Sequence, residues 1–261
     1  MSGESGGDPK DLCRDWFTRH ADNYATDASQ RGGPDLVLLL ERLETRPGDR
    51  ALDLGTAAGN TARALAPRVA EVVGLDLTPA MRARFEEEAR AAGLGNLRFA
   101  VGDADRIPFP DADFDLLTCR RAVHHFPDPA AALAEAARVL RPGGRAGFAD
   151  MAAPADPAAA DLFNGLERAR DPSHRRALGV AEWRRLVEGA GFEVLTEAAL
   201  PDRIPWAKWL SPVAAGGPED ALARERLAAA GAVARADVVA GEGEGLLFLK
   251  TRVVITARKP G

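Results

Sequence analysis

The chain has 261 residues, a length typical of one large domain or two small ones. With 46% hydrophobic and 28% charged residues, its composition is that of a globular protein that needs neither disulfides nor a structural metal to form a core. The two cysteines, Cys13 and Cys119, exclude a disulfide framework, and no CxxC pair suggests zinc or redox chemistry. We therefore expect a reducing, cytoplasmic setting and no metal.

The charge pattern argues against two classes of partner. The formal net charge is −5, and only four of the 34 basic residues are lysines, with the arginines scattered among acidic residues. A nucleic-acid backbone is neutralised by a basic stripe, which this chain lacks, so no nucleic acid is expected as a partner. Residues 1–11 lack the apolar core of a signal peptide, and apolar runs such as 36–40 are too short to span a bilayer.

The spacing of apolar residues predicts the elements of the first part of the chain, after a disordered segment over residues 1–10. Thr78-Pro79 and Asp128-Pro129 each resemble an N-cap followed by a proline in the first turn of a helix. The expected helices are 11–25, 34–45, 60–66 and one after each of these two caps. The expected strands are 50–54, 71–77, 97–101, 114–118 and 145–149.

The last third of the chain is less regular. We expect a helix over 180–190, a strand over 192–195, an inserted and partly helical segment over 205–236, and a long strand over 246–257. Strands that alternate with helices predict a parallel sheet covered on both faces. Because we find no internal repeat and no convincing linker, residues 11–261 are predicted to form one α/β domain.

The most informative segment is 51–61, with the sequence ALDLGTAAGNT. An apolar strand leads into a turn of small residues that opens directly into a helix. Gly55 and Gly59 would let a ligand approach the backbone, and the free N–H groups at the start of the helix favour an anionic group. The same pattern also fits a simple tight turn between a strand and a helix.

Two acidic residues follow the next two expected strands. Asp76 lies 21 residues after Gly55, where an acid can accept hydrogen bonds from a ribose diol. The glycine spacing departs from G-x-G-x-x-G, which favours a smaller nucleoside ligand over a dinucleotide. Asp103, in the segment 102–105, could accept a hydrogen bond from an exocyclic amine such as that of adenine. Parallel strands end at one edge of a sheet, so we expect these groups to share a crevice.

Taken together, these elements resemble the class I S-adenosylmethionine-dependent methyltransferases, and within them the small-molecule branch similar to the ubiquinone/menaquinone C-methyltransferases. The likeness covers about residues 12–150 and is weak beyond 155. One departure is Ala57, where this family often has glycine. The matching elements are Asp53-x-Gly55-x-x-x-Gly59, Gly74-x-Asp76, Gly102-Asp103-Ala104, Pro108-Phe109, Phe114-Asp115, the segment 138–144 (RVLRPGG) and Phe17-x-x-His20-Ala21-x-x-Tyr24.

The resemblance implies a Rossmann-like, mostly parallel seven-stranded sheet with helices on both faces, N-terminal lid helices and a C-terminal helical insertion. Residues 11–46 would form the lid, 47–150 the cofactor-binding core, and 151–261 the substrate side and last strands. The cofactor would be S-adenosylmethionine, with S-adenosylhomocysteine as product. The implied cofactor-binding residues are Tyr24, Gly55, Thr56, Gly59, Asp76, Leu77, Asp103, Ala104, Cys119 and Arg120.

Within that set, Gly55, Thr56 and Gly59 would contact the methionine part, Asp76 the ribose, and Leu77 the adenine. Asp103 and Ala104 would face the adenine amine and edge, and Cys119 or Arg120 would lie near the sulfonium. Tyr24 and His20 would cover the cofactor. Asp53 would orient the loop or receive the amino group of the cofactor through water.

Two histidines are the candidate catalytic groups. His124 precedes His125 just after a strand, and two adjacent histidines cannot share a helix face, so we expect at most one to point at the substrate. His174 is a candidate general base, although a histidine beside Asp171 also suits a loop-pinning role. Trp206 and Trp209 could wall a flat apolar acceptor or anchor the inserted helices.

The sequence therefore predicts in-line methyl transfer from S-adenosylmethionine to a small-molecule acceptor, and it is compatible with a homodimer. Two alternatives within the same resemblance remain open: methylation of an acyl group on a carrier protein, and a non-catalytic module that binds the same ligand. A nicotinamide-dependent oxidoreductase on a similar sheet is disfavoured by the glycine spacing.

Overall fold

The computed structural model describes residues 8–26 and 31–261. Seven strands follow one another across a single sheet in the order β3-β2-β1-β4-β5-β9-β7. The five strands from β3 to β5 are parallel, whereas β9 runs antiparallel to both β5 and β7. The strands are β1 Arg50–Leu54, β2 Glu71–Asp76, β3 Leu97–Val101, β4 Phe114–Arg120, β5 Leu140–Ala153, β7 Glu193–Pro205 and β9 Leu247–Arg258.

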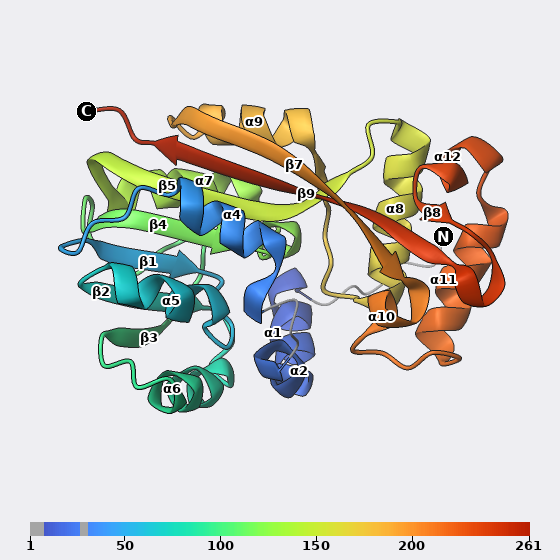
Figure 1. Cartoon of the computed structure of the whole chain (residues 1–261), viewed down its shortest axis with the longest axis horizontal. Helices are drawn as coiled ribbons and strands as arrows, with labels where there is room; N and C mark the ends of the chain where they lie inside the picture. The colour runs from blue at the N-terminus through green and yellow to red at the C-terminus, as the bar shows by residue number, and fades with distance from the viewer. Residues whose placement is uncertain (1–7, 27–30) are drawn as a thin grey trace.

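Two short strands, β6 (Leu178–Gly179) on β5 and β8 (Val239–Ala240) on β9, complete the sheet. The sheet lies between two layers of helices, with α4 on the near side and α7 and α9 on the far side in Figure 1. The helices are α1 Pro9–Arg19, α2 Ala21–Thr26, α4 Pro34–Arg42, α5 Asn60–Leu65, α6 Met81–Ala91, α7 Pro129–Val139, α8 Pro157–Arg170, α9 Val180–Gly189, α10 Trp206–Leu210, α11 Pro218–Ala229 and α12 Ala232–Ala236.

The predicted Rossmann-like α/β fold is confirmed, and the central strands follow from their sequence. In β1 the four residues after Arg50 are buried, as expected for a parallel strand covered by helices on both faces. The core on one side of the sheet centres on Phe114, Phe148 and Trp183. Among the described residues, no helix is both long and apolar enough to cross a membrane.

The helical prediction needs correction at several points. The helix expected over 11–25 is two helices that meet at His20, and α1 already begins at Pro9 because the Asp8 side chain accepts from the Lys10 amide at 2.8 Å. Residues 8–10 are therefore ordered in a helix start, and residues 1–7 lie outside the described range. Thr78 does not cap α6, whose N-cap is Ala80, whereas Asp128 does cap α7.

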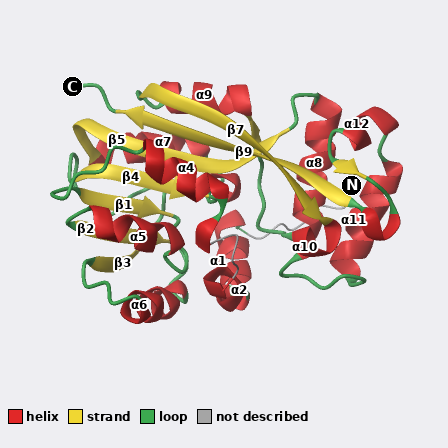
Figure 2. Cartoon of the chain, in the orientation of Figure 1, coloured by secondary structure: helices red, strands yellow, loops and turns green. Residues whose placement is uncertain are grey.

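The C-terminal third departs most from its prediction. The helix α8, which is capped by Asp156, was not predicted. The strand β7 ends ten residues later than predicted, because exposed polar residues interrupt its apolar pattern. The strand β9 is continuous through Lys250. The ends of β7 and β9 extend beyond the parallel strands and carry the group formed by α8, α10, α11 and α12 (Figure 2).

That helical group has its own apolar core. Trp209 stacks on Phe248 with ring centroids 4.6 Å apart, and the ring of Phe163 of α8 packs against the same phenylalanine at 5.2 Å. Trp206 also lies in this core and donates from its indole N–H to Asp220 at 2.8 Å. Aromatic side chains therefore anchor the inserted segment to β9 and α8. This anchoring is one of the two roles predicted for Trp206.

A buried ion-pair cluster fixes α4 to the sheet. Asp35 in the first turn of α4 is fully buried and accepts from the guanidinium groups of Arg120 and Arg121, at 2.7 Å for the shorter contact to each. Burial alone would raise the pKa of Asp35, but the two arginines lower it well below its ordinary value.

We expect Asp35→Ala to lower the free energy of unfolding by about 3–5 kcal/mol, because it leaves two buried guanidinium groups without their anion. Urea denaturation followed by circular dichroism measures this change. Glu41→Ala, at an exposed position of the same helix, is the matched control and should change stability by less than about 0.5 kcal/mol. Equal effects of the two substitutions would contradict the structural role of the cluster.

Candidate functional site

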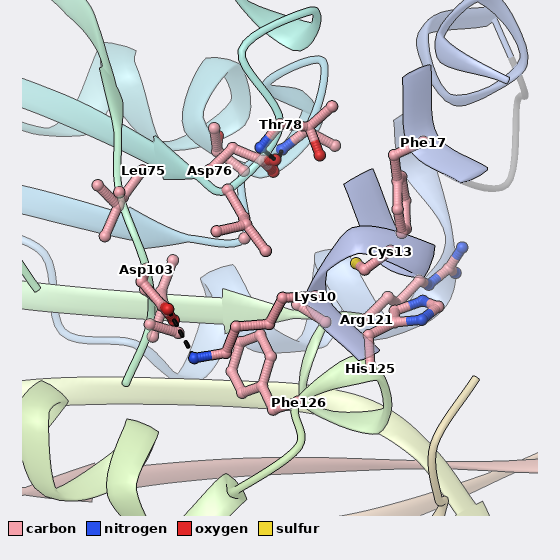
Figure 3. A pocket seen from close by; sticks show the side chains of 18 of the residues that line it. Lys10, Cys13, Phe17, Leu75, Asp76, Thr78, Asp103, Arg121, His125 and Phe126 are labelled. Carbon is pink, nitrogen blue, oxygen red and sulfur yellow. Dashed lines mark hydrogen bonds and ion pairs between the residues drawn. The ribbon is translucent and has the colours of Figure 1, made fainter. Parts of the chain in front are cut away.

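A hollow of about 950 Å³, partly open to solvent, lies where β1, β2 and β3 end. Open α/β sheets bind ligands at this edge. In Figure 3 the ends of the strands form one wall of the hollow, and α1 crosses opposite them. The predicted site residues that line the hollow are Gly55, Thr56, Asp76, Leu77, Asp103, Ala104 and Arg120.

The turn between β1 and α5 forms the floor of this hollow. Gly55 has a φ of +68°, and a Cβ atom there would lie 2.5 Å from the Cβ of Ala122, so only glycine fits. Ala57, the departure from the glycine of the family, also has a positive φ of 46°. Its amide N–H donates to a carboxylate oxygen of Asp76 at 2.8 Å, and this bond holds the strained turn in place.

Asp53 lies beneath this turn and is not exposed to the hollow. One carboxylate oxygen accepts from the Thr56 hydroxyl at 2.6 Å and the other from the Thr118 hydroxyl at 2.7 Å. Burial raises the pKa of Asp53 to about 6, and the hydroxyl donors only partly oppose that effect. Asp53 therefore orients the turn relative to β4, which is the first of the two roles expected for it.

Asp76 ends β2 at the side of the hollow. Its second carboxylate oxygen accepts from the Thr78 amide at 2.8 Å, so each oxygen holds one backbone N–H and keeps a further lone pair. Burial raises the pKa of Asp76, against the lowering effect of these backbone donors. This carboxylate is therefore preorganised as a hydrogen-bond acceptor at the wall of the hollow.

Asp103 is not free to bind a ligand amine, because Lys10 of α1 reaches across the hollow to it. The Lys10 ammonium lies 2.6 Å from the Asp103 carboxylate and 2.7 Å from that of Asp105 (Figure 3). No sequence pattern indicated this lysine as a site residue. An amine that binds Asp103 would take the place of the ammonium group.

One face of α1 closes the hollow. Lys10, Cys13 and Phe17 line it, and their spacing of three and then four residues places them on the same helix face. Burial raises the pKa of the Cys13 thiol to about 12, so the thiol stays protonated at neutral pH. The Phe17 ring packs edge-on against His125 at 5.0 Å. The helical spacing was visible in the sequence, but the direction of this face was not.

Several residues predicted to touch the cofactor lie elsewhere. Cys119 belongs to β4 and is buried in the core, and Gly59 is the N-cap of α5 against the Phe85 ring; neither residue lines the hollow. The ring of His20 bonds the Trp16 carbonyl at 2.9 Å and packs on the Trp16 ring, outside both hollows. Tyr24 belongs to α2, but its side chain lies outside the described part of the chain.

Arg120 lines the hollow, but its guanidinium is bonded to Asp35. The expectation that Arg120 lies near the sulfonium stays a prediction. The next residue, Arg121, has a positive φ of 55°, a conformation that costs a residue with a side chain about 1–2 kcal/mol. Its amide donates to the Ala149 carbonyl at 2.7 Å, and its guanidinium bonds Asp35. These contacts hold the strained residue between two hollows.

The second hollow, of about 1050 Å³, adjoins the first and shares Arg121 and His125 with it. The ends of β7 and β9 and the helices α8 and α10 surround it. Its lining residues are Asn23, Arg121, His124, His125, Met151, Arg170, Asp171, Asp202, Arg203, Ile204, Pro205, Lys208, Trp209, Ser211, Pro212, Lys250 and Arg252.

His124 and His125 both line the second hollow, whereas we expected at most one of the pair to point at the substrate. They sit in the 3₁₀ turn Val123–His125, which brings their rings to 4.0 Å. Nδ1 of His124 lies 2.6 Å from a carboxylate oxygen of Asp150 at the C-terminal half of β5. Burial alone would raise the pKa of Asp150, but His124 and backbone donors lower it. Among the described residues, Nε2 of His124 has no hydrogen-bond partner.

His174 is not a general base. It is 1% exposed, lines neither hollow, and its Nε2 lies 2.8 Å from the Asn164 side-chain oxygen. Burial and the neighbouring His124 lower its pKa to about 2, which leaves the ring neutral and too weakly basic to accept a proton at neutral pH. The alternative expectation holds, because His174 joins α8 to the loop that follows it.

No group of three metal-ligating side chains occurs in the described residues. A sequence model of a methyltransferase domain matches residues 52–148, a range that begins within β1 and ends within β5. A Bacillus subtilis methyltransferase, YcgJ, is 41% identical over 170 residues, which make up 65% of this chain and 67% of YcgJ. The crystal structure of YcgJ superposes with a TM-score of 0.77 over 87% of this chain and 98% of that one, at 33% identity. The chain belongs to the class I S-adenosylmethionine-dependent methyltransferases.

Other methyltransferases are similar over a smaller part of their length. A demethylmenaquinone methyltransferase of Deinococcus radiodurans is 43% identical over 46% of this chain and 48% of its own length. A 27-O-demethylrifamycin SV methyltransferase of Amycolatopsis mediterranei is 35% identical over 49% of this chain and 47% of its own. The named acceptors of these relatives differ, so the similarity identifies the methyltransferase domain without one acceptor.

Two glycines of the methyltransferase allow a matched test of the close contact between Gly59 and the Phe85 ring. Gly59→Ala places a Cβ atom 2.6 Å from the Phe85 ring at a φ of +81°, whereas Gly93→Ala meets no atom within 4 Å at a φ of +68°. We expect the Gly93 variant to lose about 1 kcal/mol of unfolding free energy from strain alone. The Gly59 variant should lose about 1–3 kcal/mol more from the clash. Urea denaturation measures both, and equal losses would show that the Phe85 contact is not restrictive.

Proposed function

We propose that this methyltransferase transfers the methyl group of S-adenosylmethionine to a small-molecule acceptor. The observation that carries the proposal is that Asp76 and Asp103, which end adjacent strands, line one hollow whose floor is the turn from β1 to α5. The lining of that hollow mixes apolar side chains with a few polar groups, as small-molecule sites do.

The residues present fit that cofactor. Gly55 and Thr56 form a turn that has no room for a side chain at position 55. This exposed backbone suits contact with the methionine part of the cofactor. Asp76 offers the free lone pairs that a ribose diol needs, and Leu77 offers an apolar contact to adenine. The carboxylate of Asp103 suits the adenine amine once Lys10 has moved away. The bound cofactor supplies an electrophilic methyl group on a sulfonium.

The chain's own part is to position the acceptor and exclude water. Phe17 of α1 and Phe126 after β4 line opposite sides of the first hollow and cover it (Figure 3). Alignment of a nucleophile with the reacting bond supplies about 7–11 kcal/mol of a barrier. The shared residues Arg121 and His125 mark the boundary where the acceptor in the second hollow meets the methyl group.

His124 is the proposed proton acceptor. Asp150 holds its Nδ1, so Nε2 is the nitrogen that faces the acceptor, in the arrangement that catalytic histidines use. The cofactor, once bound, would supply its methyl group to the lone pair of the acceptor atom and would leave as S-adenosylhomocysteine. The proton of the acceptor atom passes to Nε2 of His124.

The cofactor site is tested at Asp76. We expect Asp76→Asn to weaken the binding of S-adenosylhomocysteine by about 10- to 150-fold, since a hydrogen bond to a charged group contributes about 1.5–3 kcal/mol. Isothermal titration calorimetry measures the affinity, with circular dichroism to verify the fold. Asp111→Asn is the control, because Asp111 carries an exposed carboxylate that does not line the hollow. This variant should bind S-adenosylhomocysteine as the wild type does. No binding by the wild type would refute the proposed function.

The proton acceptor is tested at His124. With an acceptor that loses a proton, His124→Gln should reduce turnover by about 10²- to 10⁴-fold and leave the affinity for S-adenosylhomocysteine unchanged. Transfer of a tritiated methyl group to a panel of phenols, acids and amines measures turnover. His20→Gln is the control because that ring lies outside both hollows. Undiminished turnover in the His124 variant would exclude the histidine as the base.

A further inference from the structure

The second hollow is markedly cationic for a chain with a net charge of −5. Two carboxylates, Asp171 and Asp202, line it. Asp171 is buried and accepts from the amide and hydroxyl of Ser173, whereas Asp202 lies on an exposed stretch of β7. The lining cations outnumber them and come from five separate elements or loops. These cations are Arg121, Arg170, Arg203, Lys208, Lys250 and Arg252.

Three of the cations have buried anionic partners behind the wall of the hollow. Lys250 and Arg170 both bond Glu167 of α8, at 3.0 and 2.6 Å. Arg121 shares Asp35 with Arg120. These pairs hold the side chains in fixed positions, and each buried carboxylate serves two cations. The wall therefore keeps an excess of positive charge.

Arg252 is the exception among the buried cations. It is 8% exposed and lines the second hollow from β9, yet it has no hydrogen-bond or ion-pair partner within residues 8–26 and 31–261. Burial lowers its pKa to about 10, and the nearby positive charge of Arg121 adds to this effect, whereas the carboxylates of Asp35 and Asp202 oppose it without bonding the guanidinium. The guanidinium remains charged at neutral pH. A buried charge without a partner is costly, so such a group signals a missing ligand.

Two further cations stand at the rim of the same hollow. Arg203 on β7 and Lys208 on α10 are exposed, and their side chains make no ion pair in the described part of the molecule. Arg252 lines the same hollow from β9, where it pairs with Leu200 of β7, three residues before Arg203. A planar guanidinium binds a carboxylate or phosphate through two parallel hydrogen bonds.

We propose that the second hollow binds the acceptor through an anionic group, a carboxylate or a phosphate, which bonds Arg252 and is attracted by Arg203 and Lys208. The inference rests on the proposed function, because it takes this hollow as the acceptor site. The anionic end of the acceptor lies toward β7 and β9. Its reacting atom lies at the boundary marked by Arg121 and His125, where the two hollows meet.

The test uses the full chain saturated with S-adenosylhomocysteine and two probes, sodium pyrophosphate and sodium benzoate, which separate the phosphate from the carboxylate source. Isothermal titration calorimetry is run with wild type, Arg252→Gln and Arg258→Gln. The last is the matched control, since it removes one arginine from the exposed end of the same strand. We expect at least one probe to bind, at least tenfold more weakly to the Arg252 variant, and equally to wild type and control.

Arg203→Gln combined with Lys208→Gln is a second variant at exposed positions, where the fold does not depend on the side chains. It should weaken the binding of the same probe by about three- to tenfold, because it removes two positive charges from the rim. This variant keeps the test decisive if the Arg252 variant does not fold.

The outcomes separate this inference from the proposed function. If S-adenosylhomocysteine does not bind, the proposed function fails. If it binds but neither anion does, or if anion affinity is unchanged in both variants, the anionic acceptor is refuted while the cofactor site stands. An anion that competes with S-adenosylhomocysteine would lie in the first hollow, and that result would also overturn the inference.

Discussion

The carboxyl edge of the sheet is organised by the need to satisfy buried carboxylates. A carboxylate removed from water is costly unless donors or cations surround it, so each one draws several elements together. Asp35 joins α4 to the segment after β4, and Glu167 joins α8 to α10 and β9. Asp53 and Asp76 hold the turn after β1, and Asp150 holds the histidine turn. The walls of both hollows depend on these five carboxylates.

The carboxylates fall into two groups by the direction of their pKa shifts. Asp35, Asp150 and Glu167 have lowered pKa values, so they stabilise the folded state above the ordinary carboxyl pKa, and that stability is lost as the pH falls. Asp53 and Asp76 have raised pKa values, so the folded state binds their protons more tightly and ionisation at neutral pH lowers stability. The second group supports the cofactor hollow, where a donor-rich ligand would relieve that cost.

Much of the cofactor half could be predicted from sequence because its signals are local. A strand, a small-residue turn and a helix in succession fix where Gly55 and Asp76 lie, and both line the hollow. The acceptor half depends on pairings between distant residues. Nothing near Lys10 in the sequence indicates that it reaches Asp103, and nothing near His174 indicates that it faces Asn164. The strand β7 was predicted to end at residue 195 because many of its later residues are exposed and polar.

The charge of the second hollow follows from the same constraint, applied to cations. Buried arginines and lysines normally take anionic partners, and Arg121 and Lys250 do so. With Arg252 the fold retains a desolvated positive charge beside others, at a cost that packing alone does not explain. A neutral acceptor would leave that cost in place, and the sulfonium of the proposed cofactor would add another cation nearby. An anionic acceptor is attracted both to Arg252 and to the sulfonium. Its binding neutralises positive charge and orients the acceptor at the boundary between the two hollows.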